Sequence, residues 1–166
     1  MKGEIFMITL KTESIKKKYQ EILKLDKGRH HTFRKFMDDA ISGVDKIIEL
    51  TATLYQQAQT KYNENKKFLK TKDKGLNNQE LNNKAFEMLF STLDIDRFVV
   101  QIKGLFPDIC TQINQYNAYY KKKLLKTKLD KKKKEFADLL ETHVKERKQH
   151  HTDIDTIKSS IKRHVK

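Results

Sequence analysis

Tryptophan is absent from this sequence of 166 residues, proline occurs once and glycine five times. Proline and glycine interrupt helices more strongly than any other residues. Their scarcity permits long helices over most of the chain and predicts an all-α fold. Cys110 is the only cysteine, which excludes an internal disulfide and is typical of a reducing compartment. Because it lies beside Ile109 and Ile113, we expect a small buried hydrophobe and not a nucleophile.

Motifs for catalysis and for cofactor binding are also absent. No glycine-rich phosphate-binding loop occurs, and the Glu-x-x-His pairs of a four-helix di-iron site are missing. His150 and His151 each have a carboxylate four residues away, but no third metal ligand is evident unless His30 and His31 fold alongside. The sequence therefore predicts a protein without enzymatic activity, without a cofactor and without a metal.

Long apolar runs are missing as well. The apolar residues near the N-terminus, Ile5 to Ile8, are too few for a secretory signal. No run approaches the length of a membrane-spanning helix. We therefore expect a cytoplasmic protein with no transmembrane segment.

The charge of the chain is strongly unbalanced. Lysine and arginine number 36 against 22 acidic residues, which gives a formal net charge of +14. This charge predicts an anionic partner, although an AT-rich genome would also enrich lysine. Lysine is a point charge and not a planar fork, so attraction to a polyanion backbone is favoured over base-specific recognition. A chain of this length is expected to fold as a single domain, residues 1–166.

Residues 1–28 are predicted to form an N-terminal arm and a short helix. Apolar residues recur at helical spacing from Ile15, Thr12 is a candidate N-cap, and Gly28 ends the helix. Three consecutive lysines, Lys16 to Lys18, are most simply the solvated face of that helix.

A second helix is predicted over residues 30–72, where the seam positions step alternately by four and three residues. This heptad pattern indicates a helix about 60 Å long that pairs along its length with another helix. The seam consists of Met37, Ile41, Val44, Ile48, Thr51, Tyr55, Ala58, Tyr62, Asn65 and Leu69.

The segment 76–106 is the most apolar part of the chain and the only one without excess basic charge. We expect it to be the hydrophobic hub, with a long helix clamped onto each side, because burial of apolar surface is the largest favourable term in folding. Asn77 and Glu80 have the spacing of a capping box at its start. Residues 91–96 are predicted to divide the hub into two short helices.

Gly104 and Pro107 predict a boundary between helices, since glycine often follows a helix and proline often opens one. Residues 107–166 would then form one long basic helix, straight or kinked, because no later residue breaks a helix. A straight helix of that length would pair with residues 30–70 or with another chain. The favoured fold is an elongated all-α bundle of antiparallel, coiled-coil-like helices around the hub. A compact bundle is the alternative, and a homodimer through the long helices is compatible with the same pattern.

A lysine tract in the last segment is the first candidate binding surface. Its like charges at helical spacing repel one another, which costs helix stability unless a ligand offsets it. Nucleic acid phosphates would do so, and nearby tyrosines would stack on unpaired bases. A solvated helix with tyrosines in the seam is the competing interpretation, and an anionic membrane surface is a third. The candidate nucleic-acid-binding residues are Lys121, Lys122, Lys123, Lys126, Lys128, Lys131, Lys132, Lys133, Lys134, Tyr116, Tyr119 and Tyr120.

A second candidate surface is the C-terminal seam, where steps of four and three continue. Its polar members would fix the helix register or the choice of partner. The candidate partner-binding residues are His143, Arg147, His150, Ile154, Ile157 and Ile161.

Two functions are compatible with these features. The first is non-enzymatic binding of DNA or RNA, with little sequence preference, through the lysine tract. The second is that of a protein–protein adaptor or inhibitor, a small accessory protein of a bacterium or mobile element. Such a protein would wrap its partner with the long helices and meet an acidic protein surface.

Overall fold

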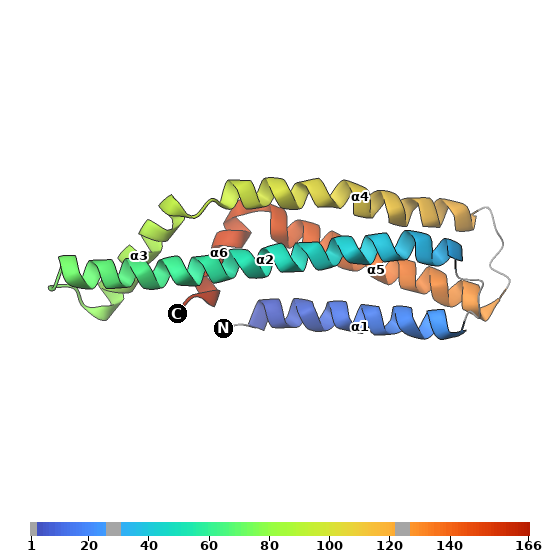
Figure 1. Cartoon of the computed structure of the whole chain (residues 1–166), viewed down its shortest axis with the longest axis horizontal. Coiled ribbons are helices and arrows are strands. Elements are labelled where there is room, and N and C mark those ends of the chain that lie inside the picture. Colours follow the sequence, from blue (N-terminus) through green and yellow to red (C-terminus); the bar gives the residue numbers. More distant parts are fainter. Residues whose placement is uncertain (1–2, 26–30, 122–126) are drawn as a thin grey trace.

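A computed structural model describes residues 3–25, 31–121 and 127–166 of the chain. These residues form a bundle of six helices without a strand, which confirms the all-α prediction (Figure 1). The coiled-coil character of the bundle stays a prediction. The helices are α1 (Gly3–Leu25), α2 (His31–Lys72), α3 (Asn78–Thr92), α4 (Ile95–Lys121), α5 (Lys128–Thr152) and α6 (Ile154–His164).

Helix α2 extends along the whole bundle, and all the other helices pack against it (Figure 1). The predicted seam is its buried side, but that side is wider than a heptad stripe because further residues are buried beside it. These are Phe33, Ala40, Ile47 and Leu54. The prediction of a long helix over residues 30–72 is thus confirmed, and the hydrophobic core follows this helix.

The segment 76–106 divides into two helices as predicted, with the break at Leu93 and Asp94. The predicted cap is also present, because the Glu80 backbone N–H donates to Asn77 Oδ1 at 2.8 Å. However, α3 lies at one end of the bundle and Val100 is 69% exposed (Figure 1). The segment is therefore one part of a core that α2 organises, and its role as a central hub stays a prediction.

The predicted boundary between Gly104 and Pro107 is wrong, because α4 continues through both residues. Its buried residues Ile102, Phe106, Ile109 and Ile113 keep helical spacing across the proline and pack in the core. Proline removes one backbone hydrogen bond from a helix, and here the packing on both sides outweighs that loss.

Helix α1 begins at Gly3, so Thr12 is not an N-cap. Thr12 is buried within the helix, where its hydroxyl donates to the Ile8 carbonyl at 2.9 Å. The expected end at Gly28 lies outside the described residues.

The last segment, residues 107–166, is not one helix. After α4 ends, the Thr127 hydroxyl accepts from the Asp130 backbone N–H at 3.1 Å and so opens α5. Asp153 similarly caps α6. Helix α5 returns antiparallel to α4 and packs against it, so the chain covers its own apolar faces (Figure 1). No helix in the described part of the chain is long and apolar enough to cross a membrane.

The close approach of α2 and α4 depends on Gly43. A Cβ added there would overlap Ile109, with that residue's Cδ1 only 2.7 Å away. A Cβ added at Gly104, on the outer side of α4, would meet nothing within 4 Å. Gly43 is therefore required by packing, whereas Gly104 is not.

We predict opposite effects for the two glycine-to-alanine substitutions. Gly43→Ala should lower the free energy of unfolding by about 1–3 kcal/mol, because the added methyl group forces α4 away from α2. Gly104→Ala should raise it by about 0.5–1 kcal/mol, since alanine has the higher helix propensity. Urea denaturation followed by circular dichroism measures both. Equal effects of the two substitutions would show that α2 and α4 are not tightly packed at Gly43.

Candidate functional site

From Lys128 onward, the lysine tract occupies the first turns of α5. Asp130 is the acidic residue within it, and its carboxylate accepts from the Thr127 backbone N–H at 3.4 Å as part of the cap. Lys128, Lys131 and Lys132 are exposed, and within the described residues they form no ion pair. These three lysines therefore present uncompensated charge to the solvent.

The two following lysines serve the fold instead. Lys133 is 4% exposed, and its ammonium lies 5.6 Å from the centre of the Phe33 ring, a cation–π contact. Lys134 Nζ donates to Asn117 Oδ1 at 3.1 Å and to Asp138 Oδ1 at 2.7 Å. The prediction that Lys133 is part of a binding surface is wrong, because it is buried.

The other lysines of the predicted tract fall at or beyond the end of α4. Lys122, Lys123 and Lys126 lie outside the described residues. Lys121 ends α4, but its side chain and that of Tyr120 also lie outside them.

Tyr116 does not face the solvent. It is fully buried, with its ring 5.3 Å from that of Phe33 in an edge-to-face arrangement. Phe33 also packs against Phe136, and Phe136 stacks on Tyr19 at 5.5 Å. The prediction that Tyr116 stacks on a base is therefore wrong, because it belongs to an aromatic cluster that joins α1, α2, α4 and α5. Tyr119 is half-buried.

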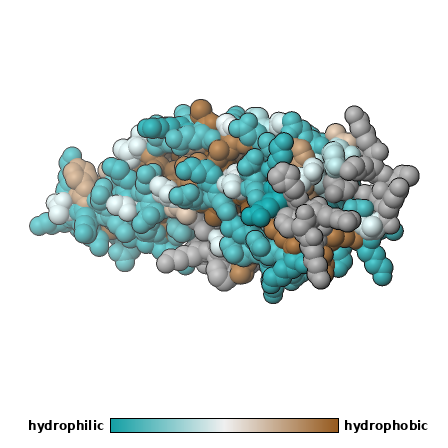
Figure 2. Space-filling view, turned by 45° about the vertical axis from the view of Figure 1, so that its right-hand side comes forward, coloured by the Kyte–Doolittle hydropathy of each residue, from teal (hydrophilic) through white to brown (hydrophobic). Residues whose placement is uncertain are grey.

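Helix α1 adds one lysine to the same end of the bundle. Lys18 faces Lys132 across a groove of about 410 Å³ between α1 and α5. Phe136 and the partly exposed Leu139 contribute to its apolar lining. Figure 2, in which this end comes forward, shows hydrophobic side chains between hydrophilic ones. Glu21, Ile22, Leu25 and Glu135 complete the groove.

The sequence did not indicate this contribution because Lys16 to Lys18 form a single run. The fold separates its members: Lys16 Nζ lies 2.7 Å from Asp45 Oδ1 on α2, whereas Lys18 lines the groove. The hydrogen bond to Asp45 raises the pKa of Lys16. The spacing of Ile15, Tyr19 and Ile22 indicates which side of α1 is buried, and this places Lys18 at its margin.

The predicted partner-binding residues are mostly used within the chain. His143, Arg147, Ile157 and Ile161 are buried, Ile154 is half-buried and His150 is exposed. The predicted seam placed His150, three residues after Arg147, on the buried side. Instead, the next buried residue of α5 after Arg147 is His151, four residues later. The reason is that His151 meets Thr51 of α2, with Nδ1 3.4 Å from Oγ1. A partner-binding role for the buried residues is therefore wrong.

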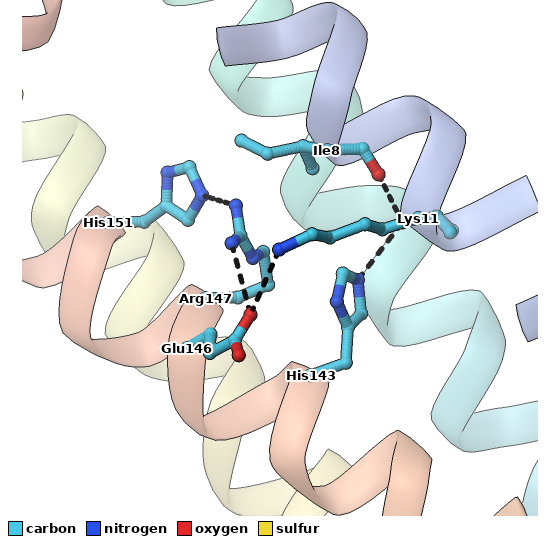
Figure 3. A network of polar contacts seen from close by, with 7 residues as sticks. Ile8, Lys11, His143, Glu146, Arg147 and His151 are labelled. Atoms are coloured by element: carbon cyan, nitrogen blue, oxygen red, sulfur yellow. Dashed lines mark hydrogen bonds and ion pairs between the residues drawn. The ribbon is translucent and has the colours of Figure 1, made fainter.

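A row of buried polar groups joins α5 to α1 and α2 (Figure 3). His143 Nε2 lies 3.0 Å from Thr12 Oγ1. Because the Thr12 hydroxyl already donates its proton to a carbonyl, the His143 ring must be the donor in this contact. Arg147 lies one turn further along and approaches His151 at 3.4 Å. Lys11 of α1 reaches Glu146 at 3.6 Å on the solvent side of this row.

The environment of His143 disfavours its protonation. Burial and the neighbouring positive charges of Arg147 and Lys11 lower its pKa to about 4, and Glu146 opposes this shift only in part. At neutral pH the ring is uncharged and joins α1 to α5 by a hydrogen bond. This row is therefore a structural element, and the exposed lysines at the end of the bundle are the candidate site.

The chain was compared with models of protein families, with curated proteins and with solved structures, and no match was found. Within the described residues, no group of three or more His, Cys, Asp or Glu side chains could hold a metal ion. The assignment of a function depends on the surface chemistry alone.

The low pKa of His143 predicts that acid destabilises the protein. The folded-state pKa is about 4 and the ordinary value is 6.5, so between these values the unfolded state binds more protons. Stability should therefore fall as the pH is lowered from 6.5 to 4, with this group contributing about 3 kcal/mol. Urea denaturation at a series of pH values measures the change.

The substitution His143→Gln isolates this contribution, because glutamine can donate to Thr12 but does not titrate. The variant should lose less stability than the wild type between pH 6.5 and pH 4. His150→Gln, at an exposed histidine two turns along the same helix, should leave the wild-type pH dependence unchanged. An unaltered pH dependence in His143→Gln would contradict the assignment.

Proposed function

We propose that the protein binds DNA or RNA through the lysines at the α1–α5 end of the bundle, without enzymatic activity and with little sequence preference. The observation that carries this proposal is the exposure of Lys128, Lys131 and Lys132, which have no ion-pair partner within the described residues. Lys18 of α1 adds a fourth positive charge across the groove, which Glu21 and Glu135 also line. Nucleic acid phosphates are the polyanion that such a surface attracts most generally.

The chemistry of these side chains supports backbone contact over base recognition. Lysine ammonium groups pair with phosphates as point charges and do not form the bidentate contacts by which arginine identifies guanine. Of the described aromatic residues at this end, Tyr19, Phe33 and Phe136 are buried and cannot stack on a base, and Tyr119 is half-buried. Binding at this end is therefore expected to depend on charge and to fall steeply with salt.

The rival proposal of a protein–protein adaptor loses its main support. It depended on apolar residues of the C-terminal seam that needed a partner surface, but Ile157 and Ile161 are buried within the chain. An acidic protein surface would still attract the same lysines. Its affinity would also fall with salt, but with a shallower slope, because a protein surface lacks the condensed counterions of a nucleic acid. A homodimer through the long helices stays a further, untested proposal.

Neutralising the exposed lysines of α5 tests the proposed function. The triple variant Lys128→Gln, Lys131→Gln and Lys132→Gln should bind a labelled random duplex at least tenfold more weakly at this end of the bundle. The slope of log affinity against log salt should become less negative by about 2 to 3, because each removed lysine leaves about one phosphate without its counter-charge. Fluorescence anisotropy at several salt concentrations measures both quantities.

A control variant removes the same charge elsewhere. Lys46→Gln, Lys103→Gln and Lys148→Gln change three exposed lysines on α2, α4 and α5, away from the groove. Their combined effect on the salt slope should be below one. A wild-type protein that does not bind at low salt, or two triple variants with equal effects, would contradict the proposed function.

A further inference from the structure

The opposite end of the bundle carries a second concentration of lysine. There α2 extends beyond α1 and α5, and α3 folds back along it (Figure 1). Six lysines occur between residues 61 and 74, against two acidic residues, Glu64 and Asp73. We call the described residues 61–84 the α2–α3 tip. The sequence alone indicated no functional role for this stretch.

Exposed lysines of the tip lie at the end of α2 and in the turn that follows it. Lys67 and Lys70 are three residues apart near the end of α2, and Lys74 lies in the turn after it. All three are exposed, and within the described residues none of them forms an ion pair. The nearby acids are engaged elsewhere, since Glu64 lies 3.9 Å from Lys61 and Asp73 lies 4.0 Å from Lys84. The three lysines therefore repel one another without compensation.

The same segment carries an exposed aromatic ring. Phe68 is 49% exposed, although Tyr62 on the same helix is buried against Phe86 of α3. The Lys72 ammonium lies 5.2 Å from the centre of the Phe68 ring. Lysines that track a phosphate backbone, next to a ring on which an unpaired base can stack, are the two components of a single-strand binding surface. The α1–α5 end has exposed lysines but no such exposed ring among the described residues.

The distance between the two basic surfaces follows from α2 itself. Lys133 lies over Phe33, which places the lysine tract at the start of α2. Phe68 is 35 residues further along the same unbroken helix. At a rise of 1.5 Å per residue the two positions are about 50 Å apart. That span equals about 15 base pairs of duplex, so a short duplex cannot occupy both surfaces at once.

We propose that the α2–α3 tip is a second nucleic-acid-binding surface, so that one chain holds two segments of nucleic acid about 50 Å apart. This inference rests on the proposed function of the α1–α5 end. The tip prefers single-stranded segments because of Phe68, whereas the α1–α5 end accepts either form. The protein thereby bridges two segments of nucleic acid, or a duplex and an adjoining single strand.

The number of short ligands bound per chain tests the inference. The probe is an eight-base-pair duplex, about 27 Å long, titrated at low salt by isothermal calorimetry with the oligomeric state recorded by light scattering. The wild-type chain should bind two duplexes. Lys67→Gln, Lys70→Gln and Lys74→Gln together should leave one, and so should the α5 triple variant. All six substitutions should abolish binding.

The role of Phe68 is tested separately in the α5 triple variant, where the tip is the remaining surface. Phe68→Leu should weaken binding of a six-nucleotide thymidine oligomer roughly tenfold, because leucine offers no ring on which a base can stack. Binding of the eight-base-pair duplex should change less than twofold. Equal weakening for the two ligands would overturn the single-strand preference.

The outcomes separate the two proposals. If the wild-type chain binds one duplex, the α5 triple variant binds none and the tip variant still binds one, the inference is overturned and the proposed function stands. If the wild-type chain binds one duplex and only the tip variant loses it, the proposed function and the two-site arrangement are both overturned. No binding by the wild type at low salt would overturn both. Two duplexes, of which each variant retains one, would support both.

Discussion

Burial of one side of α2 along the whole bundle is the constraint on which the rest of the structure depends. An isolated helix of 42 residues with this apolar side would expose it to water, and each of the other helices covers a part of it. The same constraint fixes the positions of charge. Because α2 is continuous, the lysines beside Phe33 and those beside Phe68 are held apart at a defined distance and cannot merge into one surface.

The buried polar and charged groups decide which lysines and histidines remain on the surface. Lys133 is positioned over an aromatic ring, and His143 bonds to Thr12 of α1. Such groups are costly to bury unless they have partners, so each one specifies which helices meet and in which register. The neutral state of His143 belongs to this arrangement, because a charged ring next to Arg147 would oppose the packing of α1 against α5.

Patterns among residues close in the sequence predicted the helices. Contacts between helices determined where some helices end and which side chains are exposed. The heptad pattern of α2 and the Asn77 cap could be recognised because the residues responsible lie within a few turns of one another. The continuation of α4 through Pro107 could not, since it depends on core contacts of residues on both sides. The same holds for the site. Whether His150 or His151 is buried, and whether Lys133 is exposed, depends on which helix faces α5, and periodicity along one helix does not contain that information.

The distribution of ion pairs bears on why the chain is so basic. An AT-rich genome explains an abundance of lysine, but it does not explain where the acidic partners lie. In the body of the bundle, lysines of α1 pair with acids of other helices, Lys11 with Glu146 and Lys16 with Asp45. At the two ends, Lys128, Lys131 and Lys132 of α5 and Lys67, Lys70 and Lys74 of the α2–α3 tip have no ion pairs within the described residues. Like charges left uncompensated on a helix cost stability. Exposed lysines without ion pairs also occur in the described body of the bundle, as Lys103 and Lys148 show. What distinguishes the ends is spacing, since the three lysines of each set lie within eight residues of one another, where a bound polyanion would offset their repulsion.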